Sequence, residues 1–394
     1  MPLIIWRPPT PGAGVARAHA FKYWVSTELS PVPIYFSGMS SSLTLRAGPA
    51  ALALIRERGL RAQDVDIVPG GAGGAKWLSI GGLDRFLFGE FLQAPRERPM
   101  HLIGSSIGAW RLACFAQRDP IAALERGHHG YIYDQMYTPN PRPREVTEVL
   151  GRLLDDILGE HGVDEILSHP WAKLHVITAM TRRLSAKGSR FALGTALGAL
   201  AFGNLITRKA LGLQITRFVF HSAGEGTPFA HLADLPTVHA ALTRENLRDV
   251  LFASGAIPMV VEGVEIPGRR GEVHWDGGVV DYHPDLDFGP GEGLILYPHY
   301  YDHIVPGWFD KGLSWRRASG ANFDRVLLIA PSPEFVASLP GGIIPDRKDF
   351  YAFDHPERIR RWQASLDASR QLGEELRELI GSGTIAESVK PWST

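Results

Sequence analysis

The sequence has little cysteine and almost no net charge, and each shortage excludes a class of protein. A single cysteine, Cys114, stands in 394 residues, so no internal disulfide can form and the fold does not depend on an oxidising compartment. Lys and Arg number 41 against 42 for Asp and Glu, and the formal net charge of −1 gives no argument for nucleic acid as a partner. Cys114 itself is expected to be a small buried core residue.

Long apolar runs are also missing. Hydrophobic residues make up 44% of the chain, but they are never continuous over the ~20 positions that a membrane-spanning helix needs. The apolar run within residues 1–9 is short and flanked by prolines, which is unlike a secretory signal peptide. We therefore expect a cytoplasmic protein of ordinary globular composition, long enough for one large domain or two.

Glycine, in contrast, is abundant with 43 residues, and its placement carries the main functional signal. Gly104 and Gly108 frame Ser106 in a Gly-x-Ser-x-Gly motif, preceded by an apolar strand and followed by a helix-forming stretch. This pattern predicts a nucleophile elbow, in which a tight turn leaves no room for side chains beside the serine. Ser106 is therefore the candidate nucleophile, and the helix that begins after it directs N–H groups at an oxyanion formed there.

Two further motifs follow predicted strands. The strand expected at residues 65–68 runs into the glycine-rich loop 69–76, whose bare amides can face an anion. The strand expected at residues 272–275 ends at Asp276-Gly277-Gly278, which holds a carboxylate on a turn. Glycine loop, serine and aspartate thus occur in that order, each at the end of a predicted strand.

With these motifs in this order, the chain resembles the patatin-like phospholipases, a family of lipid acyl hydrolases. The family's glycine loop, Gly-x-Ser-x-Gly and Asp-Gly-Gly/Ala motifs correspond to residues 72–77, 104–108 and 276–278. The small-residue segment 253–258 is similar to the one that precedes the family's aspartate, and the resemblance covers roughly residues 65–284.

The chain departs from the family pattern at three positions, Ala72, Trp77 and Tyr282. Ala72 and Trp77 replace the first and last glycines of the loop, and Tyr282 stands where an asparagine is usual. Trp77 must either point away from the site or narrow it, which would change substrate choice.

The resemblance implies a catalytic dyad in which Asp276 accepts the proton of Ser106, with no histidine. It implies an oxyanion hole built from the amides of Gly73, Gly74 and Ala75, and the substrate would be a lipid or another carboxylic ester. The residues expected to shape the loop and the turns are Lys76, Gly104, Gly108, Gly277 and Gly278. This chemistry requires neither a metal nor an organic cofactor.

Predicted helices and strands alternate along the chain, which indicates an α/β fold. Strands are expected at residues 65–68, 100–103, 173–178, 215–220, 293–297 and 325–330, and helices at 51–58, 82–92, 109–117, 145–159, 246–252 and 356–381. Such alternation implies a mainly parallel sheet covered on both faces, a three-layer α/β/α architecture. The stretch 126–144 is predicted to be a long surface loop.

The predicted domain organisation is one α/β hydrolase domain with a cap. Residues 1–47 are expected to form an N-terminal extension with a strand-like piece at 33–36, residues 48–345 the domain, and residues 346–394 a C-terminal helix packing on its outside. The cap is expected at residues 184–213, and its uncharged stretch 191–206 fits either a buried small-residue helix or a lid that meets lipid.

Two other functions remain open from the sequence. An α/β-hydrolase would complete a Ser-Asp-His triad with one of the late histidines, which are His283, His299, His303 and His355. A catalytically silent lipid-binding protein would account for the departures at Ala72, Trp77 and Tyr282. His128 and His129 have no other ligand-type residue at metal spacing, so we do not assign a metal site there. The sequence leaves the head group, acyl length and oligomeric state undetermined.

Overall fold

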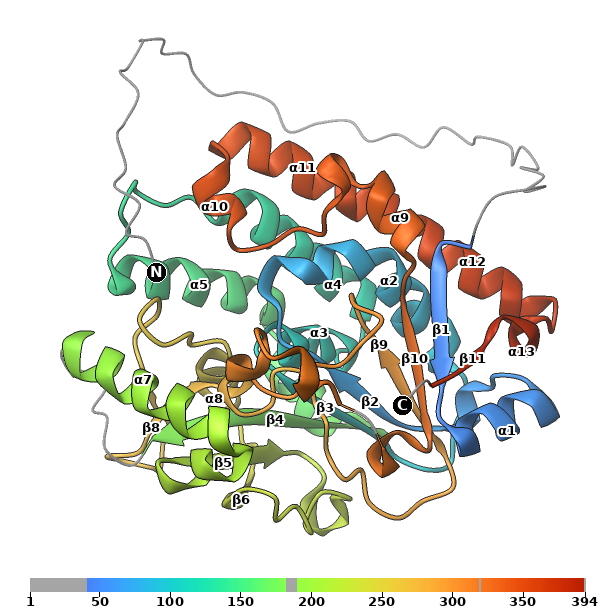
Figure 1. Ribbon diagram of the computed structural model, residues 1–394, viewed down its shortest axis with the longest axis horizontal. Coiled ribbons are helices and arrows are strands. Elements are labelled where there is room, and N and C mark those ends of the chain that lie inside the picture. Colours follow the sequence, from blue (N-terminus) through green and yellow to red (C-terminus); the bar gives the residue numbers. More distant parts are fainter. Residues whose placement is uncertain (1–40, 182–189, 319, 393–394) are drawn as a thin grey trace. The chain divides into compact units, whose positions relative to one another are not determined.

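The computed structural model describes residues 41–181, 190–318 and 320–392, all of them within the unit Ser40–Thr394 (Figure 1). The strand predicted at residues 33–36 and the start of the predicted cap, residues 184–189, lie outside the described residues. None of the described helices is long and apolar enough to cross a membrane.

A central sheet of 11 strands, with the path β11-β1-β10-β9-β2-β3-β4-β5-β6, organises the described part of the chain. The strands are β1 (Leu43–Ala47), β2 (Val65–Gly70), β3 (Met100–Ser105), β4 (Ala172–Thr181), β5 (Ile215–His221), β6 (Thr237–Ala241), β7 (Val264–Glu265), β8 (Val273–Asp276), β9 (Leu294–Pro298), β10 (Val326–Pro331) and β11 (Lys390–Pro391). Strands β10, β9, β2, β3 and β4 run parallel. β1 is antiparallel to β10 but parallel to β11, β5 is antiparallel to β4 but parallel to β6, and β8 is antiparallel to β4 and β7. The predicted mainly parallel sheet is confirmed.

Helices cover both faces of this sheet (Figure 1). They are α1 (Pro49–Arg58), α2 (Gly81–Gly89), α3 (Ile107–Phe115), α4 (Pro120–His129), α5 (Pro143–Leu158), α6 (Gly162–Ser168), α7 (Arg190–Ile206), α8 (Leu247–Ser254), α9 (Pro333–Ser338), α10 (Asp349–Ala352), α11 (His355–Ala368), α12 (Arg370–Gly381) and α13 (Ile385–Ser388).

Alternating strand residues divide the apolar core into two layers. In β3, Leu102 packs in the larger cluster with α2, α3, α5 and α12, while its neighbour Ile103 packs in the second cluster with α7. The same alternation separates Val68 from Ile67 in β2, because successive strand residues point to opposite faces. The predicted three-layer α/β/α architecture is confirmed.

Both ends of the described chain join this core. Strand β1, at the end of the predicted N-terminal extension, pairs with β10 in the sheet. The helix predicted at residues 356–381 is two helices, α11 and α12, separated at Ser369. The break lets α2 approach, because a Cβ on Gly82 would lie only 2.3 Å from the Ser369 carbonyl oxygen and the Gly82 N–H donates to Ser369 Oγ at 2.8 Å. Trp362 and Leu372 are fully buried in the larger cluster, so these helices pack into the core and not only on its outside.

Candidate active site

Strand register brings Ser106 and Asp276 together. β3 runs parallel to β4 and ends with Ser105 opposite Ile177. β8 runs antiparallel to β4 and ends with Asp276 opposite Thr178, the next residue of β4. Because β5 occupies the other edge of this part of β4, β3 and β8 lie along the same edge and point their carboxyl ends at each other. Ser106 Oγ donates a hydrogen bond to Asp276 Oδ2 at 2.9 Å.

Ser106 lies at a strained turn between β3 and α3. Its backbone has φ 55° and ψ −134°, and Ser106 is one of two non-glycine residues with positive φ in the described chain. A Cβ on Gly108 would lie 2.2 Å from the Gly70 carbonyl oxygen, and one on Gly104 would lie 2.8 Å from the Ala109 amide nitrogen. Neighbouring backbones thus approach too closely for side chains in this turn, which is the geometry that a nucleophile elbow requires.

The Asp276 carboxylate is buried and oriented by backbone. Its Oδ1 accepts a hydrogen bond from the Gly278 N–H at 2.7 Å, which leaves Oδ2 for Ser106. A Cβ on Gly277 would lie 2.1 Å from the Ile177 carbonyl oxygen, so this turn requires glycine. Burial raises the Asp276 pKa to about 6, although hydrogen bonds from Gly278 and Ser106 and the charges of Lys311 and Arg347 act in the opposite direction. A carboxyl group with this pKa is a stronger base than an exposed aspartate.

Ser254, at the end of α8, holds the backbone of the elbow. The Ser106 N–H donates to Ser254 Oγ at 2.9 Å, and Ser254 Oγ in turn donates to the Ile177 carbonyl at 2.7 Å. The sequence indicated only a small-residue segment at 253–258, and a serine there gives no local signal of this contact.

The glycine-rich loop lies beside Ser106, at the start of the 3-10 helix η2 (Gly74–Ile80). Among the described residues, the N–H groups of Gly73, Gly74 and Ala75 have no hydrogen-bond acceptor. Gly74 has φ 56°, and a Cβ on Gly73 would lie 2.5 Å from the Tyr300 hydroxyl. Gly73 and Gly74 line the same cavity as Ser106, whereas the Ala75 side chain is buried.

All three departures from the pattern, Ala72, Trp77 and Tyr282, are explained by packing. Trp77 is fully buried and points away from the site, with its ring 4.6 Å from that of His128 and 5.7 Å from that of Tyr131. Ala72 is buried in a small cluster with Tyr282, and its N–H donates to the Tyr282 carbonyl at 2.7 Å. Ala72 and Tyr282 thus join the glycine loop to the segment that follows Asp276.

Lys76 lies in the wall of the site. It is only 7% exposed and forms an ion pair with Asp346. Burial lowers its pKa to about 8.

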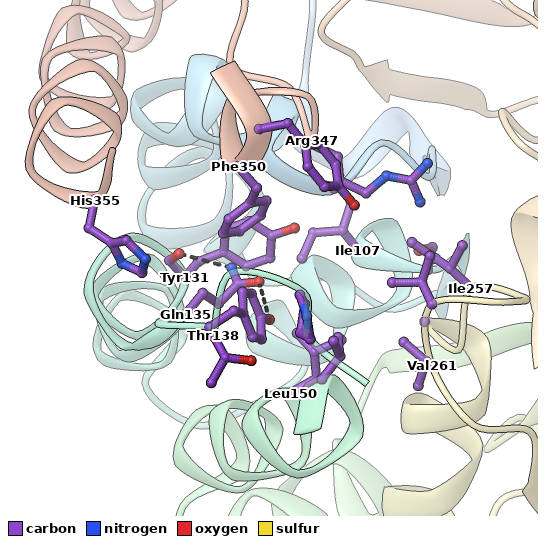
Figure 2. Close-up of a pocket in the computed structure, with 18 of the residues that line it drawn as sticks. Ile107, Tyr131, Gln135, Thr138, Leu150, Ile257, Val261, Arg347, Phe350 and His355 are labelled. Carbon is purple, nitrogen blue, oxygen red and sulfur yellow. Dashed lines mark hydrogen bonds between the residues drawn. The ribbon is translucent and has the colours of Figure 1, made fainter. Parts of the chain in front are cut away.

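An apolar cavity extends from Ser106 between α5, the turn Gly130–Asp134 and α10 (Figure 2). Its apolar walls include Ile107, Tyr131, Leu150, Ile257, Val261 and Phe350. The surface loop predicted at residues 126–144 is wrong in part, because a π-helical turn, Gly130–Asp134, continues α4 and buries Tyr131. Tyr131 packs at 5.9 Å from Trp362, a residue from the C-terminal part of the chain that no local pattern connects with it.

A second, more polar cavity meets the first at Ser106. It is lined by Ser106 and Asp276, by the glycine loop and by three basic side chains, Lys76, Lys311 and Arg347. Gly74, Ser106, Ile257 and Arg347 line both cavities, so the two form one continuous site with Ser106 at the junction.

None of the late histidines hydrogen-bonds Ser106 or Asp276 within the described chain. His283 Nε2 lies 2.7 Å from the Tyr300 hydroxyl and His303 Nδ1 lies 3.0 Å from Asp302. His299 Nδ1 accepts from the Tyr301 N–H at 2.8 Å, and His355 contacts Met136.

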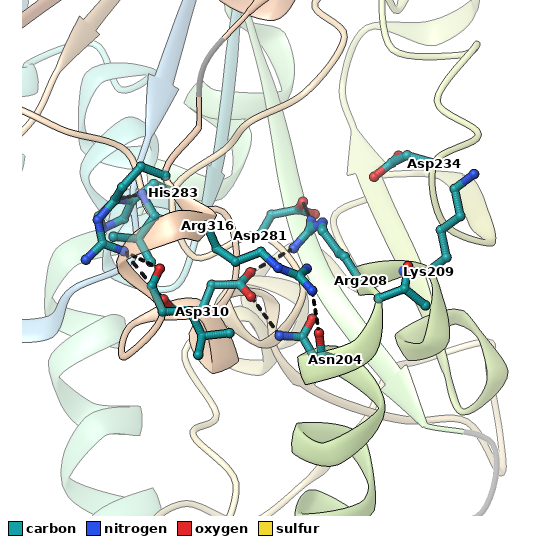
Figure 3. A network of polar contacts seen from close by, with 12 residues as sticks. Asn204, Arg208, Lys209, Asp234, Asp281, His283, Asp310 and Arg316 are labelled. Atoms are coloured by element: carbon teal, nitrogen blue, oxygen red, sulfur yellow. Dashed lines mark hydrogen bonds and ion pairs between the residues drawn. The ribbon is translucent and has the colours of Figure 1, made fainter. Parts of the chain in front are cut away.

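A buried polar network anchors the segment after Asp276 (Figure 3). Asp281 is fully buried and accepts hydrogen bonds from Arg208 at 2.9 Å and from Arg217 at 2.7 Å. Arg208 also lies 3.8 Å from Asp310, which accepts a hydrogen bond from Asn204 of α7 at 2.7 Å. The network connects the aspartate turn with α7 and with the loop that carries Lys311.

No group of three or more His, Cys, Asp or Glu side chains is placed to hold a metal ion in the part of the chain that the structure describes. Cys114 is fully buried, and burial raises the pKa of its thiol to about 12, so it is a core residue as predicted.

A family model described as patatin-like phospholipase matches residues 70–284, a range that includes the glycine loop, the elbow and Asp276. The comparisons with curated proteins and with solved structures gave no match. The resemblance found in the sequence is thereby confirmed, whereas Lys311 and Arg347 lie outside the matched range.

Proposed function

The chain belongs to the patatin-like phospholipase family of lipid acyl hydrolases, and from this premise we propose that it cleaves carboxylic esters of lipids through a Ser106–Asp276 dyad. The observation that carries the proposal is the 2.9 Å hydrogen bond from Ser106 Oγ to a buried carboxylate. A serine hydroxyl is a poor nucleophile and needs a base within such a distance.

In the proposed reaction Asp276 takes the Ser106 proton as Oγ attacks the ester carbonyl carbon. The carbonyl oxygen becomes an oxyanion that accepts hydrogen bonds from the free N–H groups of Gly73, Gly74 and Ala75. Collapse of the tetrahedral intermediate breaks the bond to the alcohol, which leaves with the proton from Asp276. Water, deprotonated by Asp276, then hydrolyses the acyl-enzyme and restores Ser106.

The cavities support an assignment of the two halves of the substrate. The cavity lined by Leu150, Val261 and Phe350 suits an acyl chain, because apolar walls bind hydrocarbon by excluding water. The alcohol half would then occupy the polar cavity beside Lys76. Lys76, paired with Asp346, is proposed to support the loop and not to act as a base.

Fluorophosphonate labelling followed by peptide mass spectrometry tests the dyad. We expect the adduct on Ser106, with labelling strongly suppressed in Asp276→Asn. The matched controls are His283→Ala, His299→Ala, His303→Ala and His355→Ala, each of which should keep esterase activity. A loss of about a hundred-fold or more in one of them would favour a Ser-Asp-His triad instead. An unlabelled Ser106 would favour a silent lipid-binding protein.

The cap, residues 184–213, is proposed to make peripheral contact with the lipid surface through α7. Phe202, Leu205 and Ile206 share one face of this helix, and Phe202 and Ile206 are 69% and 71% exposed. Leu213 follows at 80% exposed in η5 (Arg208–Leu213), and Lys209 between them adds a positive charge suited to anionic head groups.

The double variant Phe202→Ser/Ile206→Ser tests this contact. We expect weaker flotation with vesicles of phosphatidylcholine and phosphatidylglycerol and slower hydrolysis of vesicle-borne esters, with unchanged hydrolysis of a soluble short-chain ester. Ile343→Ser removes a similarly exposed apolar side chain elsewhere and serves as the control. Unchanged vesicle binding in the double variant would contradict the proposed contact.

A further inference from the structure

The polar cavity beside Ser106 contains more basic than acidic groups. Three cations, Lys76, Lys311 and Arg347, line it together with two carboxylates, Asp276 and Asp346. Asp346 is paired with Lys76. Asp276 accepts hydrogen bonds from Ser106 and Gly278 and is the base in the proposed reaction.

Lys311 and Arg347 are exposed side chains that line this cavity, and neither has an acidic partner of its own. Neither side chain forms a hydrogen bond or an ion pair with any residue of the described ranges 41–181, 190–318 and 320–392. Lys311 Nζ lies 3.8 Å from the centre of the Tyr282 ring and 5.8 Å from that of Trp308. These aromatic rings hold the ammonium group at the cavity without neutralising its charge.

The electrostatics of Lys311 fit a site for an anion. Burial lowers the Lys311 pKa to about 7, with the charges of Lys76 and Arg347 acting in the same direction and that of Asp276 in the opposite direction. A bound anion would reverse this effect and restore the full charge of the ammonium group, so binding of an anion and protonation of Lys311 favour each other.

The topology places this cavity where an α/β sheet binds ligands. β2 and β9 are parallel neighbours, but the chain continues from β2 toward β3 and from β9 toward β10, on opposite sides. A crevice forms at the carboxyl ends of strands where connections diverge in this way. The loop after β2 supplies Gly73 and the connection after β9 supplies Lys311.

We propose that Lys311 and Arg347 bind an anionic group on the alcohol half of the substrate, so that this hydrolase prefers esters whose alcohol carries a phosphate or a carboxylate close to the acyl oxygen. This inference rests on the proposed function. The acyl chain lies in the apolar cavity, the ester carbonyl at Ser106, and the anion in the polar cavity beyond it.

Kinetics with a matched pair of soluble substrates test the inference. The two are short-chain 1-acylglycerol 3-phosphate and the 1-acylglycerol with the same chain, which differ only in the phosphate. We expect the wild type to have the higher kcat/KM for the phosphate. Lys311→Gln and Arg347→Gln should each lower the ratio of the two kcat/KM values about tenfold or more, mainly through KM, since each removes a charge-assisted hydrogen bond.

Lys348→Gln is the matched control, because it removes one positive charge from an exposed side chain beside Arg347 that does not line the cavity. It should leave the ratio within about twofold. If the ratio of the two kcat/KM values fell equally in Lys311→Gln, Arg347→Gln and Lys348→Gln, the phosphate would be attracted by surface charge in general. That result would overturn the inference. A wild type that hydrolyses the neutral ester at least as well would also overturn it.

Protection of Ser106 from fluorophosphonate labelling gives a second readout that needs no turnover. We expect glycerol 3-phosphate to slow labelling of the wild type, with glycerol having no effect, and the protection to weaken in Lys311→Gln. Protection by inorganic phosphate alone, together with equal hydrolysis of both esters, would indicate a free-anion site and overturn the substrate assignment. If Ser106 does not label and neither ester is hydrolysed, the proposed function itself is wrong and the inference falls with it.

Discussion

Replacing Asp276 with asparagine is expected to abolish hydrolysis and, at the same time, to stabilise the fold. The asparagine side chain has nearly the same shape and keeps an oxygen for the Gly278 N–H, which donates to Asp276 Oδ1 at 2.7 Å. It removes the proposed proton acceptor of Ser106 and the buried negative charge. Loss of the proton acceptor lowers activity. Loss of the buried charge removes the free-energy cost of burying it and so stabilises the folded state.

The magnitude follows from the pKa. Burial raises the Asp276 pKa from 3.8 to about 6, so the folded state favours the protonated carboxyl group more than the unfolded state does. The stabilisation that comes with this proton is present at low pH and is lost as the pH rises through 6. Well above pH 6 the ionised carboxylate therefore costs up to about 3 kcal/mol, which for a chain of this length corresponds to roughly 3–4 °C in Tm.

Thermal unfolding of the wild type and Asp276→Asn between pH 4.5 and pH 8 measures this cost. We expect a small difference in Tm in favour of the variant near pH 4.5, which grows as the pH rises toward 6 and levels off above it. Lower stability of Asp276→Asn at pH 8, or a difference that does not change with pH, would refute the argument. So would a variant that keeps more than about a hundredth of the esterase activity.

Asp281→Asn is the matched control in the same turn. Asp281 is as deeply buried, but Arg208 and Arg217 neutralise it with hydrogen bonds of 2.9 and 2.7 Å. Removing one partner of a buried ion pair leaves the other uncompensated and costs about 3–5 kcal/mol. The two substitutions are chemically identical, yet their effects on Tm at pH 8 should have opposite signs.

Three further predictions use other features. With a soluble ester, kcat/KM should fall as the pH drops through about 6, because Asp276 must be ionised to accept a proton; a flat profile between pH 5 and pH 8 would exclude it as the base. Gly108→Ala should unfold or strongly destabilise the chain in thermal melts, since its Cβ would lie 2.2 Å from the Gly70 oxygen, whereas Gly194→Ala on α7, with open space around it, should be neutral or stabilising. Burial lowers the pKa of His101 to about 4 and that of His175 well below its usual value, so the free energy of unfolding should decrease as the pH falls from 6.5 toward 4, and His101→Gln should reduce this slope in urea titrations.

The sequence predicted the parts of the site whose chemistry is local. Gly104, Gly108 and Gly277 stand where a Cβ would meet backbone within 3 Å, and such close turns require glycine whatever the rest of the fold does. Ser106 and Asp276 could be identified because each follows a strand and belongs to such a turn. The alternation of helices and strands along the chain is enough to predict the three-layer α/β/α architecture, since parallel strands need crossover helices.

The sequence did not predict the residues that reach the site through tertiary packing. Ser254 lies in the small-residue segment 253–258, which gives no local signal of its contact with Ser106, and Lys311 and Arg347 lie in segments without a local motif. Only the register of the sheet and the path of the connections after β9 and β10 bring these residues to Ser106. The tyrosines and prolines that follow Tyr131 predict a surface loop there. The structure buries it because Trp77 and Trp362, from distant parts of the chain, cover its ring.

Helix α7 has an inner and an outer face, and this decides how the proposed lipid contact can be tested. On its inner face Leu193 packs with Val273 and Trp275 of β8, the strand that ends at Asp276. These contacts help to fix the register of β8 against β4. A shift of this register by one residue would turn the Asp276 side chain to the other face of the sheet, away from Ser106. Deleting the helix would uncover β8 and disturb the dyad, so a loss of activity after deletion cannot be assigned to lost lipid contact. Substitutions confined to the outer face, at Phe202 and Ile206, leave this packing intact, and only they separate contact with the lipid surface from support of Asp276.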